Sequence, residues 1–465
     1  MLDPAHLWDV LVIGGGNAAL CAAITARETG AEVLLAEHAP RAMRGGNSRH
    51  TRNLRAMHEA PAPPLTGRYG ADEYWDDLSR VTARETDAEL AQLTIRESAR
   101  LMAWMQTRGV RFQGSLRGTL ALDRTNAFFL GGGKALLNAL YRTAEQLGVQ
   151  ILYDTEVQSL ALEHGAVHDV AMVSRGFPAT VRAKTVVAAS GGFQANLAWL
   201  REHWGDAADN FLIRGTPYAQ GRVLRNLLDQ GAMPVGDPTQ CHAVAIDARG
   251  PKFDGGIVTR LDCVPFGIVV DRTARRFYDE GEDVWPKRYA VWGRLIAQRP
   301  EQIAFCIVDA KAETLFMPPL FPPLHAGSIA GLAVELGLDG ATLEATVREY
   351  NDAVRAGRFD PDALDECRTE GLSPPKSHWA RRIDTPPFLA WPLRPGITFT
   401  YLGLRVDAQA RVRLADGRPA ENLFAAGEIM AGNILGRGYL AGIGMTIGAV
   451  FGRIAGREAA RHARN

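Results

Sequence analysis

Cysteine is scarce in this sequence, and its spacing excludes the common protein metal centres. Five cysteines are scattered along the chain, as Cys21, Cys241, Cys263, Cys306 and Cys367. Because no two of them form a Cys-x-x-Cys pair, neither a zinc site nor an iron–sulfur cluster is encoded. We therefore predict buried thiols, no metal, and a reducing, cytoplasmic compartment.

Long apolar runs and an excess of one charge are also missing. The longest apolar run, residues 438–451, is too short and too rich in glycine to span a bilayer. Residues 1–6 lack the basic and apolar regions of a signal peptide. The 52 basic residues balance 52 acidic ones, which excludes a global attraction to nucleic acid. The sequence thus predicts a soluble protein with no nucleic-acid partner and no direct membrane insertion.

The N-terminal region carries a dinucleotide-binding pattern. The apolar run Val10-Leu-Val-Ile13 is typical of a buried parallel strand and is followed by three glycines. Gly14 permits the tight turn, and Gly16 lets a pyrophosphate approach the backbone. A helix that begins near Asn17 offers free N–H groups to that phosphate. Glu37 follows about 20 residues later, where an acid accepts hydrogen bonds from a ribose.

Two later segments indicate which dinucleotide is bound. Residues 422–428 are a short apolar strand that ends in Gly427-Glu428, and residues 185–193 are a strand that leads into the glycine turn after Ser190. A protein that binds NAD does not need so late a return of the chain. FAD is longer and extends from the first Rossmann turn to a flavin held by the C-terminal segment. We therefore predict FAD as the cofactor.

In their order and spacing, these three segments resemble the FAD-binding domain of the fumarate reductase/succinate dehydrogenase flavoprotein superfamily. The resemblance implies an α/β fold, with a Rossmann-like, glutathione-reductase-like FAD-binding domain and an inserted α+β capping domain. A chain of 465 residues exceeds a single typical core. Prolines and aromatic residues become frequent near Pro238 and stay frequent until near Pro395. We expect the FAD-binding domain at residues 1–238 and 397–465, and the capping domain at residues 239–396.

The resemblance also implies which residues bind FAD. These are Gly14, Gly16, Asn17, Ala18, Glu37, Gly46, Asn47, Ser48, Val157, Ser190, Gly191, Gly427, Glu428, Gly444 and Met445. Residues 442–445 begin the last helix, whose N-terminus can face the N1–C2=O edge of the flavin. Respiratory members attach the flavin to a histidine after the second strand. Asn47 aligns at that position and His50 is three residues away, so we expect FAD to be non-covalent.

The segment between the FAD-binding stretches is expected to supply the substrate site. His242 aligns with a family histidine that binds a substrate carboxylate, and Arg260 could clamp a carboxylate bidentately. A structural role for His242 and a surface salt bridge for Arg260 are the alternatives. Arg288 is the candidate acid/base, with its proton relayed through neighbouring acids because an arginine pKa lies far above 7. Its rivals are Lys287, Tyr289 and Arg276.

Two departures weaken a fumarate or succinate interpretation. Reductases of the family carry an arginine where Tyr439 aligns, and here Arg437 stands two residues earlier. Either the register differs or Tyr439 and Arg437 act together; core packing is the alternative for Tyr439. Phe399 takes the place of a histidine found in those reductases.

The finer resemblance is to the family of FAD-dependent tricarballylate dehydrogenases. It rests on Gly45-Gly-Asn-Ser48, on residues 278–283 and on residues 427–439. It implies oxidation of propane-1,2,3-tricarboxylate to cis-aconitate by hydride transfer to flavin N5. Several arginines near the flavin, namely Arg52, Arg260, Arg288 and Arg437, would neutralise the three carboxylates. The alternatives are a 3-ketosteroid dehydrogenase-like enzyme, a fumarate reductase-like enzyme, a flavoprotein of corrin biosynthesis, and a non-catalytic flavin-binding subunit.

The electrons must leave the flavin for a separate acceptor, because the chain has no second nucleotide motif and no cluster ligands. The resemblance implies a membrane-associated iron–sulfur partner protein. The enzyme is then expected to be cytoplasmic and peripheral to the inner membrane through that partner.

Overall fold

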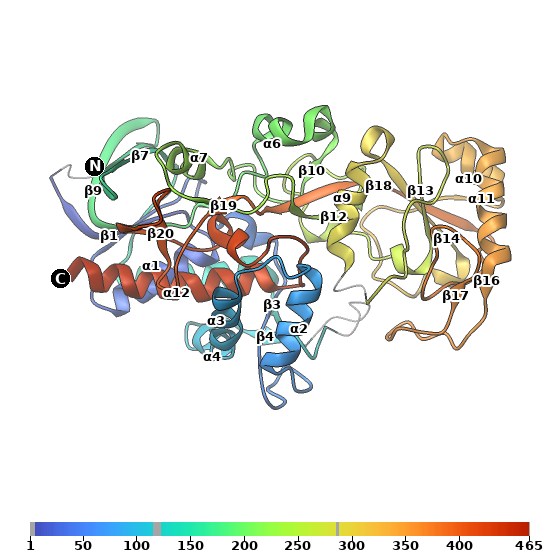
Figure 1. The fold of residues 1–465 in the computed structure, drawn as a ribbon, viewed down its shortest axis with the longest axis horizontal. Coiled ribbons are helices and arrows are strands. Elements are labelled where there is room, and N and C mark those ends of the chain that lie inside the picture. The colour runs from blue at the N-terminus through green and yellow to red at the C-terminus, as the bar shows by residue number, and fades with distance from the viewer. Residues whose placement is uncertain (1–4, 115–121, 285–287, 465) are drawn as a thin grey trace.

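A mostly parallel sheet forms one end of the molecule (Figure 1), and the computed structural model describes residues 5–114, 122–284 and 288–464. The path through the sheet is β20-β21-β9-β1-β2-β6, with β8 paired to β9 and β7 paired to β8. Its strands are β1 (Leu7–Ile13), β2 (Val33–Ala36), β6 (Gln150–Leu152), β7 (Thr155–Glu163), β8 (Ala166–Ser174), β9 (Phe177–Ala188), β20 (Arg411–Arg413) and β21 (Pro419–Ala425). β1 is parallel to β2 and β9, and β21 is parallel to β9. The last strand thus lies near the first, as a Rossmann-like sheet requires.

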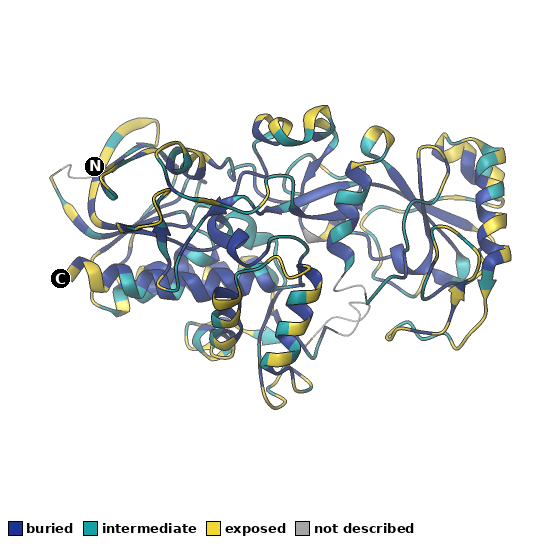
Figure 2. Ribbon diagram, viewed as in Figure 1, coloured by how far each residue is buried: buried dark blue, intermediate teal, exposed yellow. Residues whose placement is uncertain are grey.

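Helices α1 (Asn17–Glu28) and α12 (Ile443–Arg464) pack against each other on this sheet. Their approach is close because α12 presents glycines to α1. A Cβ at Gly452 would lie 2.4 Å from the Ala18 oxygen, and one at Gly456 would lie 2.2 Å from the Ala22 oxygen. Figure 2 shows most of α12 buried and only its C-terminal end exposed. This contact fixes the start of α12 beside the start of α1.

Further helices and a small sheet complete this end of the molecule. The helices are α2 (Ala71–Val81), α3 (Ala88–Ser98), α4 (Leu101–Gln106), α5 (Gly132–Gln146), α6 (Leu197–Trp204) and α7 (Arg222–Asp229). The small sheet has the order β3 (Asn53–Arg55), β5 (Asn126–Phe129), β4 (Phe112–Gln113), and a two-stranded sheet joins β11 (Pro234–Val235) to β19 (Gly403–Leu404). A short helix, η1 (Gly46–His50), leads into β3.

A second sheet is built around the long strand β18 (Phe388–Thr400). The strands that pair with it are β10 (Leu212–Ile213), β12 (Cys241–Asp247), β14 (Ala304–Asp309) and β15 (Leu324–Ala326), and β13 (Ile268–Asp271) pairs with β14. The remaining elements at this end are α9 (Trp292–Ala297), α10 (Ile329–Leu336), α11 (Gly340–Ala353), β16 (Val354–Arg355) and β17 (Arg368–Thr369). In Figure 1, α10 and α11 lie at the opposite end of the molecule from the free end of α12.

The two sheets confirm the predicted α/β fold class. The second sheet includes residues outside the expected capping domain of residues 239–396, because β10 precedes residue 239 and β18 continues to Thr400. The boundaries at 238/239 and 396/397 therefore stay predictions. All five cysteines are buried and free, which confirms the predicted thiols. Within the described ranges, no helix has the length and apolarity that a membrane crossing requires.

Candidate active site

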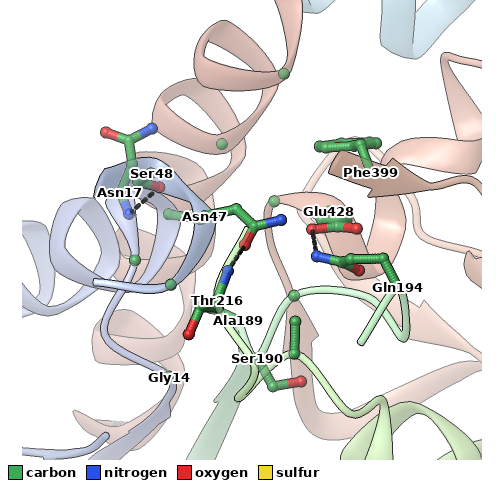
Figure 3. Close-up of a pocket in the computed structure, with 18 of the residues that line it drawn as sticks. Gly14, Asn17, Asn47, Ser48, Ala189, Ser190, Gln194, Thr216, Phe399 and Glu428 are labelled. Carbon is green, nitrogen blue, oxygen red and sulfur yellow. Dashed lines mark hydrogen bonds between the residues drawn. The ribbon is translucent and has the colours of Figure 1, made fainter. Parts of the chain in front are cut away.

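One cavity extends from the β1–α1 turn to the second sheet. Its lining contains every predicted cofactor residue: Gly14, Gly16, Asn17, Ala18, Glu37, Gly46, Asn47, Ser48, Val157, Ser190, Gly191, Gly427, Glu428, Gly444 and Met445. Of the predicted catalytic residues, the lining contains His242, Arg260 and Tyr439. Figure 3 shows how the glycine turns, η1 and the Glu428 segment surround this space.

The β1–α1 turn fits a pyrophosphate group. Gly14 has a φ of +112°, and a Cβ there would lie 2.3 Å from the Ala189 oxygen, so only glycine fits. Gly16 caps α1 without a side-chain hydrogen bond, which leaves N–H groups at the helix start for an anion. The Asn17 N–H donates to Ser48 Oγ (3.0 Å), and Asn17 Nδ2 donates to the Met445 oxygen (3.0 Å). These bonds tie the turn to η1 and to α12.

Glu37 lies at the end of β2 and is held by the backbone. Its Oε1 accepts from the Ala39 N–H (2.9 Å), and its Oε2 accepts from the Gly45 N–H (3.1 Å). The Tyr141 hydroxyl donates to Oε2 at 3.3 Å. Burial raises the pKa of Glu37. The carboxylate is thus preorganised in the cavity wall, as expected of a ribose acceptor.

Asn47 links three segments that are distant in the sequence. Its Oδ1 accepts from the Thr216 N–H (2.8 Å), and its Nδ2 donates to the Thr398 oxygen (2.5 Å). Three residues further along the chain, His50 Nε2 lies 2.5 Å from Asp254 Oδ1. The loop predicted to bind FAD therefore also joins the first sheet to the second.

Glu428, which follows β21, occupies a position in the middle of the cavity. Its Oε1 accepts from the Thr400 N–H (2.9 Å), and Gln194 Nε2 donates to its Oε2 (3.3 Å) (Figure 3). Burial raises its pKa to about 7, against the hydrogen bonds that lower it. Near neutral pH this carboxyl group is therefore a mixture of its protonated and ionised forms.

Three arginines from different parts of the chain meet at the far end of the cavity: Arg52, Arg214 and Arg260. Burial lowers the pKa of Arg52 to about 9 and that of Arg214 to about 10, and repulsion from Arg260 is the next cause in both. Arg260 donates from Nη2 to Asp262 (2.6 Å), and Arg214 donates from Nε to Thr398 Oγ1 (2.9 Å). Within the described ranges, Arg214 Nη1 and Arg260 Nε are buried without a hydrogen-bond acceptor. This arrangement is incomplete without an anion.

Beside the arginines, His242 packs between two tyrosines. Its Nε2 lies 3.2 Å from the Tyr289 hydroxyl, and its ring centroid is 3.9 Å from that of Tyr439. Burial and the charges of Arg214 and Arg260 hold the pKa of His242 well below its usual value, so the imidazole is neutral. The Tyr439 hydroxyl accepts from the Gly444 N–H (3.0 Å). Tyr439 therefore connects the arginine end of the cavity to the start of α12.

The structure does not bring Arg288 and Arg437 to the cavity. Arg288 is half-buried and forms an ion pair with Glu282, while Tyr289, the next residue, lines the cavity. Arg437 is half-buried and pairs with Glu85 at 3.2 Å. The rival Arg276 is bound to Glu280 at 2.6 Å, and Lys287 lies outside the described residues.

The sequence analysis missed Arg214 and Gln194, which both line the cavity. Arg214 follows a strand of only two residues, β10, and belongs to no motif. Gln194 stands directly after the predicted Ser190–Phe193 turn, so its position next to a cofactor segment was a usable signal.

Comparison with known proteins identifies the family. The model of the FAD binding domain family matches residues 9–445. NADH:fumarate oxidoreductase of Klebsiella pneumoniae is 27% identical over 98% of this chain, which spans about half (48%) of that protein. Two solved structures share the fold at 22% identity: an open flavocytochrome c3 fumarate reductase (TM-score 0.77, 99% of this chain and 79% of that chain) and a 3-ketosteroid-Δ4-(5α)-dehydrogenase of Rhodococcus jostii RHA1 (TM-score 0.73, 99% and 98%).

The match covers both the glycine turns and the cavity that they surround, and these residues fit FAD. The chain therefore belongs to the FAD binding domain family.

Proposed function

We propose that this protein is an FAD-dependent dehydrogenase of a small polycarboxylate, and that it oxidises tricarballylate to cis-aconitate. The observation that carries the proposal is the buried cluster of Arg52, Arg214 and Arg260 at the end of the cavity. Like charges repel strongly where water is excluded. A substrate with several carboxylates would offset that repulsion and accept from the donors that lack partners, Arg214 Nη1 and Arg260 Nε.

When bound, FAD supplies a hydride acceptor at its N5 atom. The residues of the chain orient the substrate for that transfer. Arg214 and Arg260 hold carboxylates and withdraw charge from them, which makes the neighbouring C–H bonds more acidic. Neutral His242, placed by Tyr289 and Tyr439, fills the same wall without adding a further positive charge.

The proton acceptor must reach the substrate. Tyr289 lines the cavity, whereas Arg288 is held outside it by Glu282. The acid/base role predicted for Arg288 therefore requires the Arg288–Glu282 ion pair to open. A role for Arg437 likewise requires separation from Glu85.

A steroid-like substrate is the second candidate, because Phe399, Tyr289 and Tyr439 give the cavity an aromatic side. A steroid offers no carboxylate to the arginines, however, and would leave Arg214 Nη1 and Arg260 Nε without an acceptor. The arginine cluster therefore favours the polyanion.

We also propose that the electrons pass to a separate iron–sulfur protein at the membrane, which would keep the enzyme at the cytoplasmic face of the inner membrane. The five cysteines of this chain are buried and scattered, and no group of three or more potential metal ligands occurs within the described residues. An internal cluster thus has no ligand set here.

Anaerobic reduction of the purified yellow protein tests the substrate. We expect tricarballylate to bleach the visible flavin absorbance, and succinate and a 3-ketosteroid to leave it unchanged. Bleaching by the steroid alone would replace the polyanion with the second candidate. No bleaching by any of the three, with full FAD content, would point to another substrate or to a non-catalytic flavin subunit.

The attachment of the flavin gives a separate prediction. Asn47 stands at the position of the covalent linkage in the respiratory members, and its amide is used to join Thr216 and Thr398. We expect acid precipitation to release all flavin into the supernatant. Yellow colour that stays with the precipitated protein would contradict a non-covalent cofactor.

A further inference from the structure

A buried polar cluster lies directly behind the wall formed by Ala441 and Gly442. Arg55, at the end of β3, has a side chain that is only 2% exposed. Its Nε donates to the Ala441 oxygen (3.1 Å), and its Nη1 donates to the Tyr69 hydroxyl (2.7 Å). The Tyr69 hydroxyl in turn donates to Asp77 Oδ2 (3.0 Å), which lies 3.7 Å from Arg55 Nη1. The cation is thus nearest to the wall, and its counter-ion lies behind it.

The cluster fixes one peptide group. The Ala441 oxygen accepts a second bond from Asn126 Nδ2 (2.7 Å), so this carbonyl points away from the cavity into the cluster. In a trans peptide the N–H of the next residue points the opposite way. The Gly442 N–H is therefore directed toward the cavity that Ala441 and Gly442 both line, and no described residue accepts from it.

Gly442 itself allows this approach. Its φ is +83°, and a Cβ there would lie 2.8 Å from the Arg55 nitrogen and 2.5 Å from Asn126 Nδ2. The Thr446 hydroxyl donates to the Arg55 oxygen (2.6 Å), which secures the first turn of α12 to the same strand. The turn before α12 is therefore held from behind at three points.

The flavin ring is expected next to this turn. The pyrophosphate belongs at the Gly14–Gly16 turn, and the substrate belongs at the arginine cluster. The ring then lies between them, against residues 441–445. Reduction by two electrons and one proton gives the ring a negative charge, which a nearby cation and a directed N–H stabilise.

We infer that Arg55 is a positioning residue that sets the reduction potential of the flavin: it holds the Gly442 N–H toward the ring and places a fixed positive charge behind it. Asp77 reduces that charge and thus has the opposite influence. This role depends on FAD binding and does not depend on which substrate the enzyme oxidises.

Midpoint potentials of the FAD-loaded, substrate-free enzyme test this role, measured against a reference dye during slow anaerobic reduction. For Arg55→Gln we expect the equilibrium constant of two-electron reduction to fall about tenfold, which is about 30 mV. For Asp77→Asn, whose side chain still accepts from Tyr69, we expect that constant to rise about threefold. Arg80→Gln is the matched control, because Arg80 also pairs with Asp77 (3.4 Å) but is 53% exposed. Its effect should stay within about twofold, since solvent screens its charge.

The opposite signs separate this role from a merely structural one. If the cluster only supported the fold, both variants would lose FAD or stability without opposite changes in potential. Unchanged potentials in FAD-loaded Arg55→Gln and Asp77→Asn would overturn the inference. If Arg55→Gln does not retain FAD, Asp77→Asn and Asn126→Leu still decide. The first should raise the potential and the second should lower it, because the Ala441 carbonyl loses a donor.

Discussion

Exchange of Arg214 for glutamine is expected to lower kcat/KM for the polycarboxylate about a hundredfold while it raises the melting temperature of the substrate-free holoenzyme. Charge-assisted hydrogen bonds contribute about 1.5–3 kcal/mol each, and a hundredfold loss corresponds to about 2.7 kcal/mol. The gain in stability has a different cause. Burial and Arg260 lower the pKa of Arg214 to about 10, so the residue stays charged at neutral pH but its charge is less stable in the fold than in the unfolded chain.

Glutamine suits this test because it keeps an N–H donor for Thr398 Oγ1 and removes the charge together with the Nη1 donor assigned to the substrate. Steady-state kinetics with tricarballylate and calorimetry of the FAD-loaded protein give the two readouts. Arg201→Gln is the control, since Arg201 is 53% exposed and pairs with Asp209 on the surface. A variant with full activity would remove Arg214 from the substrate site. A variant with a lower melting temperature would make Arg214 a structural residue. Lower activity together with higher stability is expected of a binding site whose positive charges repel one another until an anion binds.

The FAD-binding side of the cavity could be predicted from the sequence for a geometric reason. Gly14, Gly191 and Gly427 each follow a strand of the same parallel sheet, β1, β9 and β21. The carboxyl ends of parallel strands meet at one edge, so each glycine turn could be placed from local sequence alone. Glu37 follows β2 of this sheet and Glu428 follows β21, and both come to the same cavity.

The substrate side was less predictable because its residues come from a mixed sheet whose paired strands are far apart in the sequence. Arg214 follows β10, which pairs with β18 some 180 residues later in the chain, as its bond to Thr398 shows. No local sequence pattern predicts that Arg214 and Thr398 are neighbours. Arg288 and Tyr289 illustrate a second limit. They are adjacent in the sequence, but only Tyr289 lines the cavity, because successive residues at a helix start point in different directions.

Arg437 shows a third limit. It stands in a glycine-rich segment that resembles an active-site stretch, but it pairs with Glu85, which lies between α2 and α3. Glu85 is 352 residues away from Arg437 in the sequence. Only the folded structure therefore shows that Glu85 pairs with Arg437.

Glu428 leads to the second large prediction, a loss of stability with rising pH that Glu428→Gln abolishes. Burial raises the pKa of Glu428 to about 7 in the fold, whereas a free glutamate titrates near 4.5. Between these values the folded protein keeps a proton that the unfolded chain has released. The free energy of unfolding therefore falls as the pH rises from about 4.5 through 7, and it stays low above that range. From this shift in pKa we expect a loss of about 2–3 kcal/mol.

The measurement is urea unfolding of the FAD-free protein at acidic and alkaline pH, for wild type and for Glu428→Gln. Glutamine still accepts from the Thr400 N–H and cannot ionise. Other groups also titrate, so the informative quantity is the difference between the two proteins at each pH. That difference should be small at pH 5 and should favour the variant at pH 8.5. Glu421→Gln, at an exposed position on β21, should show the pH dependence of wild type. If Glu428→Gln also follows wild type, the carboxylate is ionised in the fold throughout, and FAD must then bind beside a full negative charge.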